Sequence, residues 1–270
     1  MNTRNLTVVA VVVAVFFTAC GKDSKLVKKE IFSGYAQKGP FVVGSSVTIV
    51  ELDVNLDQTG KTYHTIISDD FGSFEQKNIE LVSNYVELKV DGFYFHEISG
   101  QNTGAPTTLY ALVDISGVNS ANVNVLTNLE KPRVEYLVKQ GKSFAEAKQQ
   151  AQREVLAIFG FSPPQTTSEA LNLTNDAMLI AISCIIQYNG STGDMIELMA
   201  NIAADIKTDG ILKNTTLKTK LINQAVFLTT NWIDDTFLQR IRDHLESKYP
   251  NVTIPDFESY VQTFIAANQN

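Results

Sequence analysis

The sequence predicts an α+β multidomain fold, an N-terminal antiparallel β-sandwich followed by an all-α helical domain. Two observations lead to this prediction. From Gly34 to about Gly117, apolar residues recur with a period of two and turn residues separate the runs. From Val118 on, apolar residues recur at helical spacing. We therefore place the sandwich at residues 33–118 and the helical domain at residues 119–270.

The strands of the sandwich are predicted from alternation and from the turns between them. The run 45–56 alternates, with Glu51 on its polar face. Its apolar face comprises Val50, Leu52, Val54 and Leu56. Further strand candidates are Lys61–Ser68, Ser73–Asn78, Tyr85–Val90, Phe93–Ser99 and Leu109–Ile115. Turn signals lie at residues 69–72 and at Asp91-Gly92. Six or seven short strands of this kind indicate a β-sandwich.

About seven helices are expected in the second half. Ser143-Phe-Ala-Glu146 fits a capping box, and the helix that it opens should end before Gly160. Pro132 lies inside the first helical pattern and should kink that helix or shift its start. The other helical patterns are Ala177–Tyr188, Asp194–Ile206, Thr216–Thr229, Asp234–Lys248 and Phe257–Ala267.

The N-terminus has the layout of a secretory signal peptide. Arg4 precedes about a dozen apolar residues, fewer than the roughly 20 that a membrane-spanning helix needs. The run ends in Phe-Thr-Ala-Cys20, which resembles a lipobox, although Phe17 stands where leucine is usual. In a lipobox, signal peptidase II cleaves before the cysteine, whose thiol carries a diacylglycerol. We predict a signal peptide at residues 1–19, lipidation of Cys20 and a solvated tether at residues 20–32.

Charge and cysteine content narrow the functional classes. The chain has 22 basic and 29 acidic residues, and cleavage before Cys20 would leave a net charge of about −8. This acidity argues against nucleic-acid partners and against an electrostatic clamp on anionic lipid. Cys184 then has no disulfide partner, and its apolar neighbours predict a buried free thiol. The lipid is the expected membrane contact, and the cell envelope, with the outer membrane favoured, is the expected location.

Motifs of catalysis and cofactor binding are missing, so we predict a protein without enzymatic activity, cofactor or metal. The three histidines are His64, His96 and His244. No pair of them has the close spacing of a metal site, and no Gly-x-Ser-x-Gly elbow is present. The rival hypothesis is a hydrolase that uses carboxylates of the helical domain, for example Asp234, Asp235 or Glu246. A deep cleft with two facing carboxylates of raised pKa would favour it.

Two acidic stretches resemble calcium loops but lack essential ligands. In the stretch 53–57 (Asp-x-Asn-x-Asp), Gln58 follows where a calcium loop has glycine, and His64 stands in place of the bidentate glutamate. In the stretch 205–210, Lys207 occupies a ligand position. We interpret the first stretch as the wet face of a strand and the second as a helix C-cap and turn.

A sugar-binding surface is a further hypothesis. In the alternating run Phe93-Tyr-Phe-His96, Tyr94 and His96 share one face. Tyr94 together with Gln101 and Asn102 of the next loop could form a platform for a hydroxylated ring, because an aromatic plane and amides suit such a ligand. The alternative is a core face beside an ordinary surface loop.

Six stretches of the chain carry a resemblance to known proteins, at residues 34–41, 44–53, 58–60, 69–74, 85–97 and 123–130. Together they resemble a family of bacterial lipoproteins that open with a transthyretin-like, carboxypeptidase-regulatory-like β-sandwich. Residues 69–74 are similar to the Asp-x-x-Gly-x-Phe turn of the family, residues 85–97 resemble its following strands, and residues 123–130 resemble the start of its helical part. It covers about residues 33–160. It implies a fold and a non-catalytic role, because the regulatory-like module has no carboxypeptidase zinc ligands. It carries over no site residues.

These expectations combine into a lipid-anchored envelope protein that binds a polysaccharide or an envelope protein. A purely structural subunit of an outer-membrane assembly is the other non-catalytic alternative. A broad exposed apolar patch on the helical domain would favour the structural subunit over a glycan-binding protein.

Overall fold

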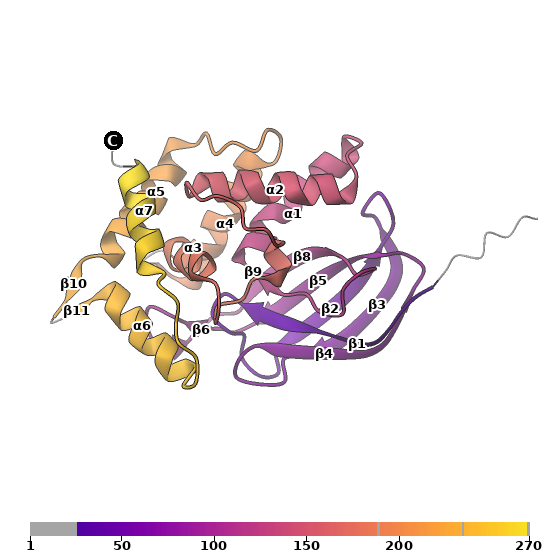
Figure 1. The fold of residues 1–270 in the computed structure, drawn as a ribbon, viewed down its shortest axis with the longest axis horizontal. Coiled ribbons are helices and arrows are strands. Elements are labelled where there is room, and N and C mark those ends of the chain that lie inside the picture. The colour runs from indigo at the N-terminus through magenta and orange to yellow at the C-terminus, as the bar shows by residue number, and fades with distance from the viewer. Residues whose placement is uncertain (1–25, 188–189, 234, 269–270) are drawn as a thin grey trace, which may run out of the picture.

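The computed structural model describes residues 26–187, 190–233 and 235–268 (Figure 1). The predicted α+β class is confirmed, since most strands precede the helices along the chain. Most of the strands lie at one end of the molecule, the helices of residues 125–158 lie beside them, and the helices of residues 215–228 and 258–268 lie at the other end (Figure 1). The predicted signal peptide and Cys20 lie outside the described residues.

Two sheets form the β part. Their strands are β1 (Val27–Gln37), β2 (Ser46–Leu52), β3 (Gln58–Ile66), β4 (Ser73–Leu81), β5 (Tyr85–Gly92), β8 (Thr107–Asp114) and β9 (Val123–Asn124). The larger sheet has the order β3-β2-β5-β8 and is antiparallel throughout. The smaller sheet has the order β4-β1-β9, in which β1 and β9 are parallel. Short pairs add β6 (Phe95–His96) with β7 (Gln101–Asn102) and β10 (Asn231–Trp232) with β11 (Asp235–Thr236).

The smaller sheet corrects both predicted boundaries of the β part. A solvated tether as far as residue 32 is wrong from Val27 on, because β1 starts there and pairs with β4. Phe32 is fully buried and pairs with Gln76. At the other end, β9 lies beyond residue 118 and still pairs with β1. The burial along β1 alternates between exposed and less exposed positions from Val27 to Glu30, as expected of a strand at a sheet surface rather than of a linker.

The predicted strand 45–56 is too long. β2 ends at Leu52, and the Asp53 carboxylate accepts hydrogen bonds from the backbone N–H groups of Asn55 and Asp57 at 2.8 and 3.0 Å, which closes a turn. Val54, expected on the apolar face, is therefore 72% exposed. The calcium-like stretch is this turn and not the wet face of a strand.

Glu51, expected on the polar face, is only 2% exposed. Its carboxylate accepts hydrogen bonds from the backbone N–H groups of Val82 and Ser83 at 2.5 and 2.9 Å, and from the Thr59 hydroxyl at 2.6 Å. Burial acts to raise the pKa of Glu51, but these hydrogen bonds outweigh it and the pKa is lowered. The carboxylate thus ties β2 and β3 to the loop after β4.

Seven α-helices follow in the described residues. They are α1 (Val125–Lys139), α2 (Phe144–Ile158), α3 (Ala177–Gln187), α4 (Thr192–Ile206), α5 (Thr215–Leu228), α6 (Phe237–Lys248) and α7 (Glu258–Asn268). The predicted capping box of Ser143 and Glu146 is confirmed. Pro132 does not shift the start of the first helix, because α1 begins behind Asn124, whose side chain caps it, and runs through Pro132.

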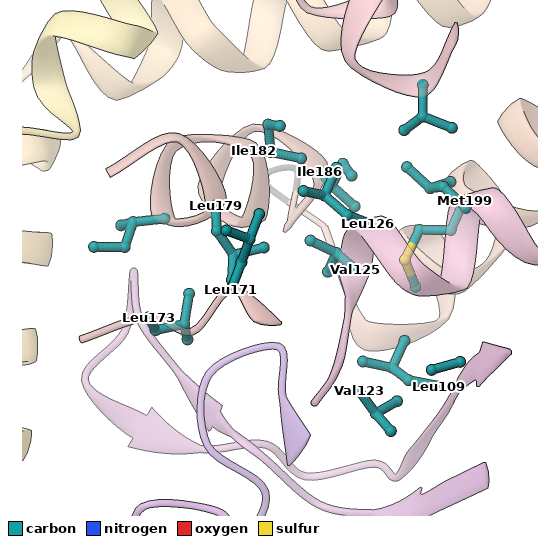
Figure 2. Packing of buried hydrophobic residues seen from close by; sticks show 14 of the residues in the cluster. Leu109, Val123, Val125, Leu126, Leu171, Leu173, Leu179, Ile182, Ile186 and Met199 are labelled. Carbon is teal, nitrogen blue, oxygen red and sulfur yellow. The ribbon is translucent and has the colours of Figure 1, made fainter. Parts of the chain in front are cut away.

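One hydrophobic core runs through both halves of the molecule. Buried residues from Phe32 in β1 to Ile265 in α7 belong to one contiguous cluster. Figure 2 shows Leu109 and Val123 of the β part in the same cluster as Leu126 of α1 and Ile186 of α3. Helix α3 is buried on all sides, as its apolar sequence requires. None of the helices in the described ranges is long and apolar enough to span a membrane. Cys184 in α3 is buried and free, as predicted.

Candidate functional site

The structure contradicts the predicted sugar platform. Tyr94 has no exposed surface, and its hydroxyl donates a hydrogen bond to Gln187 Oε1 at 3.0 Å. Gln101 and Asn102 are exposed in β7. The predicted strand 93–99 is reduced to the two residues of β6, so the alternation fails and Phe93 is 45% exposed. A ring inside the core cannot stack on a ligand, and this excludes Tyr94 as a platform.

The other sequence candidates do not gather into a site. Asp234 lies outside the described residues, whereas Asp235 and Glu246 are exposed. Asp205 accepts hydrogen bonds from the backbone N–H groups of Lys213 and Asn214 at 2.6 and 3.0 Å, which agrees with the predicted helix end and turn. Among the described residues, no group of three or more His, Cys, Asp or Glu side chains is placed to hold a metal ion.

A cavity of about 670 Å³ lies between the β part and the helices. Its wall combines the end of β8, the segment 118–121, the exposed side of α2 and the loop 163–170, which includes a short 3₁₀ helix at Ser168–Ala170. Small-molecule sites occupy roughly 300–1,000 Å³. The cavity therefore has the size of a ligand site, and its residues come from both halves of the chain.

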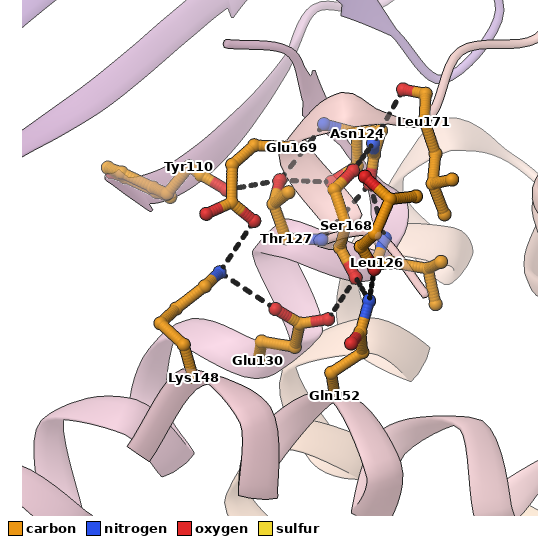
Figure 3. Close-up of polar contacts among 11 residues, drawn as sticks. Tyr110, Asn124, Leu126, Thr127, Glu130, Lys148, Gln152, Ser168, Glu169 and Leu171 are labelled. Carbon is orange, nitrogen blue, oxygen red and sulfur yellow. Dashed lines mark hydrogen bonds and ion pairs between the residues drawn. The ribbon is translucent and has the colours of Figure 1, made fainter. Parts of the chain in front are cut away.

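A buried ionic cluster forms the floor of this cavity (Figure 3). Lys148 Nζ lies 2.9 Å from Glu130 Oε2 and 3.0 Å from Glu169 Oε2. The Ser168 hydroxyl donates to the other oxygen of Glu130. Gln152 Nε2 in turn donates to Ser168 Oγ at 3.2 Å. We call Glu130, Lys148, Gln152, Ser168 and Glu169 the floor cluster.

Three elements place the floor cluster. Glu130 stands on α1, Lys148 and Gln152 lie one turn apart on α2, and the 3₁₀ helix supplies the rest. The N-cap of α1 fixes the 3₁₀ helix, because Asn124 Nδ2 donates to the Ser168 carbonyl oxygen at 2.8 Å. The Asn122 backbone N–H also donates to the Glu169 carbonyl oxygen at 2.7 Å. Asn124 therefore both caps α1 and holds the 3₁₀ helix that forms part of the cavity wall.

Charge balance in the floor cluster depends on Lys148. Burial opposes the charged form of this lysine, but Glu130 and Glu169 outweigh burial, and the pKa of Lys148 is raised. Burial also raises the pKa of the Glu130 carboxyl, and Lys148 offsets this only in part. One ammonium thus holds two carboxylates in an environment of low dielectric constant, where an unpaired charge would be costly.

The two carboxylates invite a comparison with glycosidases. Both contact the same ammonium, so their contacting oxygens lie within about 6 Å of each other, close to the spacing of acid and nucleophile in a retaining enzyme. Glu130, however, has no exposed surface, and both of its oxygens already accept hydrogen bonds. A general acid must reach the proton acceptor of its substrate. This geometry favours a structural role for Glu130 over proton transfer.

Sequence reasoning missed the floor cluster. Glu130 and Lys148 stand 18 residues apart, and Glu130 and Ser168 stand 38 apart, so no local motif joins them. One signal was present: Glu130 lies midway between Leu126 and Val134 at a spacing of four, on the buried stripe of α1. A charged residue on an apolar helix face predicts a buried partner.

Comparisons with known proteins give no functional assignment, so the function has to be argued from the residues of the chain. No family model, curated protein or solved structure matches it. The resemblance of residues 33–160 to bacterial lipoproteins remains a prediction from their motifs.

Proposed function

We propose that this chain is a lipid-anchored cell-envelope protein of the non-catalytic binding type, which holds a polysaccharide in the cavity above the floor cluster. The cavity of about 670 Å³ is the observation that carries the proposal. The signal-peptide layout before Cys20 supports the lipid anchor. The two sheets that share one core support a transthyretin-like, regulatory-like sandwich.

The cavity wall offers the groups that recognise sugars. Gln149 on α2 and the loop residues Gln165, Thr166 and Thr167 line it and are exposed. Their amides and hydroxyls both donate and accept hydrogen bonds, as sugar hydroxyls do. Phe144 is half-buried at the same wall. An aromatic face next to polar groups matches the two-sided chemistry of a sugar ring.

The charges of the cavity favour a neutral glycan over an acidic one. Four carboxylates and two cationic side chains line the wall and floor. They are Asp114, Glu130, Glu146, Glu169, Lys148 and Arg153. An excess of negative charge disfavours uronic acids, sulfates and phosphates in the ligand.

Substitution of Ala145 by tryptophan tests the cavity as the ligand site. Ala145 is exposed on α2 and lines the cavity, so an indole there would occupy the ligand volume. Affinity for a neutral surface polysaccharide, measured by calorimetry, should fall at least about tenfold, which corresponds to 1.4 kcal/mol. Ala200→Trp, at an exposed alanine of α4 away from the cavity wall, is the matched control.

The outcome also separates the competing functions. Retention of full affinity in Ala145→Trp would place the glycan elsewhere on the protein. Absence of binding to every neutral envelope glycan would contradict the polysaccharide proposal and favour a protein partner. Release of reducing ends from the bound glycan would support the hydrolase hypothesis instead.

The lipid anchor has a separate test in cells. Wild-type protein should incorporate labelled palmitate and fractionate with membranes, whereas Cys20→Ala should lose the label and leave the membrane fraction. Labelled Cys20→Ala protein would contradict lipidation at this residue. Digestion by proteinase K in intact cells would place the wild-type protein on the outer surface, and protection until lysis would place it in the periplasm.

A further inference from the structure

Three exposed apolar side chains gather at the end of the β part where the described chain begins. Leu26 is 42% exposed, Val54 is 72% exposed and Val82 is 57% exposed. Leu26 directly precedes β1, Val54 lies in the turn after β2, and Val82 lies in the loop after β4. All three line one open groove of about 780 Å³. We call these three residues the entry tip.

Strand register and buried hydrogen bonds fix the entry tip. Val27 pairs with Leu81 in the antiparallel β1–β4 ladder, so Leu26 and Val82 lie at the next step of the register. The Glu51 carboxylate holds the Val82 backbone, accepting its N–H at 2.5 Å. The turn that carries Val54 is closed by its own aspartate. These apolar groups are therefore held in solvent by the fold and cannot withdraw into the core.

The position of the proposed anchor limits what can cover the entry tip. Six residue steps separate Cys20 from Leu26, and a fully extended chain of this length spans at most about 20 Å. A globular chain of about 250 residues is roughly 45 Å across. A lipid on Cys20 therefore keeps the entry tip within about 20 Å of the bilayer, whereas the opposite end of the molecule can lie farther away.

The charge around the groove fits a lipid surface that is contacted through apolar groups. Its lining has two lysines and one aspartate. Lys28 pairs with Glu80 at 2.7 Å, and Lys29 donates to Asn119 at 3.0 Å. Glu80 compensates Lys28 and the aspartate of the groove offsets the charge of Lys29, so the groove has little net attraction for anionic headgroups.

We propose that the entry tip inserts into the headgroup region of the membrane that holds the Cys20 lipid. This inference rests on the lipid anchor of the proposed function. In this arrangement the protein contacts the membrane surface through the entry tip and keeps one orientation relative to the bilayer, instead of rotating freely about its lipid anchor. Tyr85 of the groove packs on Phe144 of the cavity, with ring centroids 4.8 Å apart. The seated protein would therefore hold its glycan close to the bilayer.

The test couples the processed chain, residues 20–270, to a maleimide lipid at Cys20, which does not depend on lipidation in cells. Cys184 is buried and stays unmodified. Vesicles of phosphatidylcholine with brominated acyl chains then quench tryptophan that enters the bilayer. Fluorescence of Val54→Trp should fall about twofold, because amphipathic surfaces bury their apolar groups roughly 5–10 Å into the headgroup boundary. The sequence already has one tryptophan, Trp232, so each variant is compared with the unsubstituted chain in the same vesicles. Ile211→Trp, at a residue 57% exposed in the loop between α4 and α5, should lose no larger a fraction of its fluorescence than the unsubstituted chain does.

Two further observations decide the inference. The fluorescence of Val82→Trp should be quenched as much as that of Val54→Trp, so that a folding defect in one variant cannot explain the result. The quenching of both variants should persist at high salt, because the contact is apolar. Absence of quenching in both tip variants, on chains that remain bound to vesicles, would overturn membrane seating. So would equal quenching of Ile211→Trp. Neither result bears on lipidation of Cys20, which the palmitate experiment in cells tests separately.

Discussion

A Lys148→Met variant is expected to lose about 3–5 kcal/mol of its free energy of unfolding, because it leaves two buried carboxylates without a counter-ion. Lys148 Nζ is the only cation within 3.0 Å of Glu130 and Glu169 in the described floor cluster. Methionine fills a similar volume, so the loss reports charge rather than a cavity. Urea denaturation at neutral pH, followed by circular dichroism, measures it. Lys142→Met, at an exposed lysine before α2, is the control and should leave the unfolding midpoint unchanged.

The pH dependence of this loss has a defined sign. The pKa of Glu130 is raised on folding, and removal of Lys148 raises it further. The ionised carboxylate therefore destabilises the fold of the variant at high pH, and protonation relieves this as pH falls. The difference between wild type and Lys148→Met should shrink as the pH falls toward about 4.3, the ordinary pKa of glutamate. The double variant Glu130→Gln with Lys148→Met should recover part of the loss at neutral pH. A loss independent of pH would contradict an electrostatic origin.

Local signals explain which parts of the fold could be predicted. The capping box of Ser143 and Glu146 lies within four residues, so its two partners meet as soon as the helix forms and can be recognised in the sequence. The periodicity of β5 needs no distant partner, and that strand begins at Tyr85 as predicted. The error at Glu51 has the opposite cause, because its partners Val82 and Ser83 are 31 and 32 residues away. A carboxylate on a polar face carries no sign in sequence that it will be buried.

The candidate sites are also difficult to predict, because they too depend on contacts between residues far apart in the sequence. The interpretation of Tyr94 as an exposed platform required regular alternation through residue 99, but the chain leaves the sheet after Gly92 and turns that ring into the core. The floor cluster brings together α1, α2 and a 3₁₀ helix, whose arrangement depends on tertiary packing. Only the isolated charge of Glu130 on an apolar stripe pointed toward it. Residues that line the cavity from a loop, such as those of 163–170, follow no periodic pattern that would reveal them in the sequence.

A second loss of about 3–5 kcal/mol in the free energy of unfolding is expected from Lys38→Met, again because a buried carboxylate loses its cation. Lys38 Nζ lies 2.9 Å from Glu97 Oε2, and both side chains are inaccessible to solvent. Burial opposes the charge of Lys38, but Glu97 outweighs burial and the pKa of Lys38 is raised. The Ser183 hydroxyl lies 2.7 Å from both Glu97 Oε1 and the Lys38 carbonyl oxygen, so this pair also joins the β part to α3.

That junction makes the variant a test of cooperativity between the two halves. Because one core spans both, Lys38→Met should shift a single unfolding transition, with β-sheet and helix signals lost together. Lys38→Met combined with Glu97→Gln should recover part of the stability, since no charge is then left unpaired. Ser183→Ala should cost about 1–3 kcal/mol through the lost hydrogen bonds. Two separate transitions, with only one of them shifted, would instead mean that the β part and the helices fold independently and that the ion pair stabilises only the part whose transition shifts.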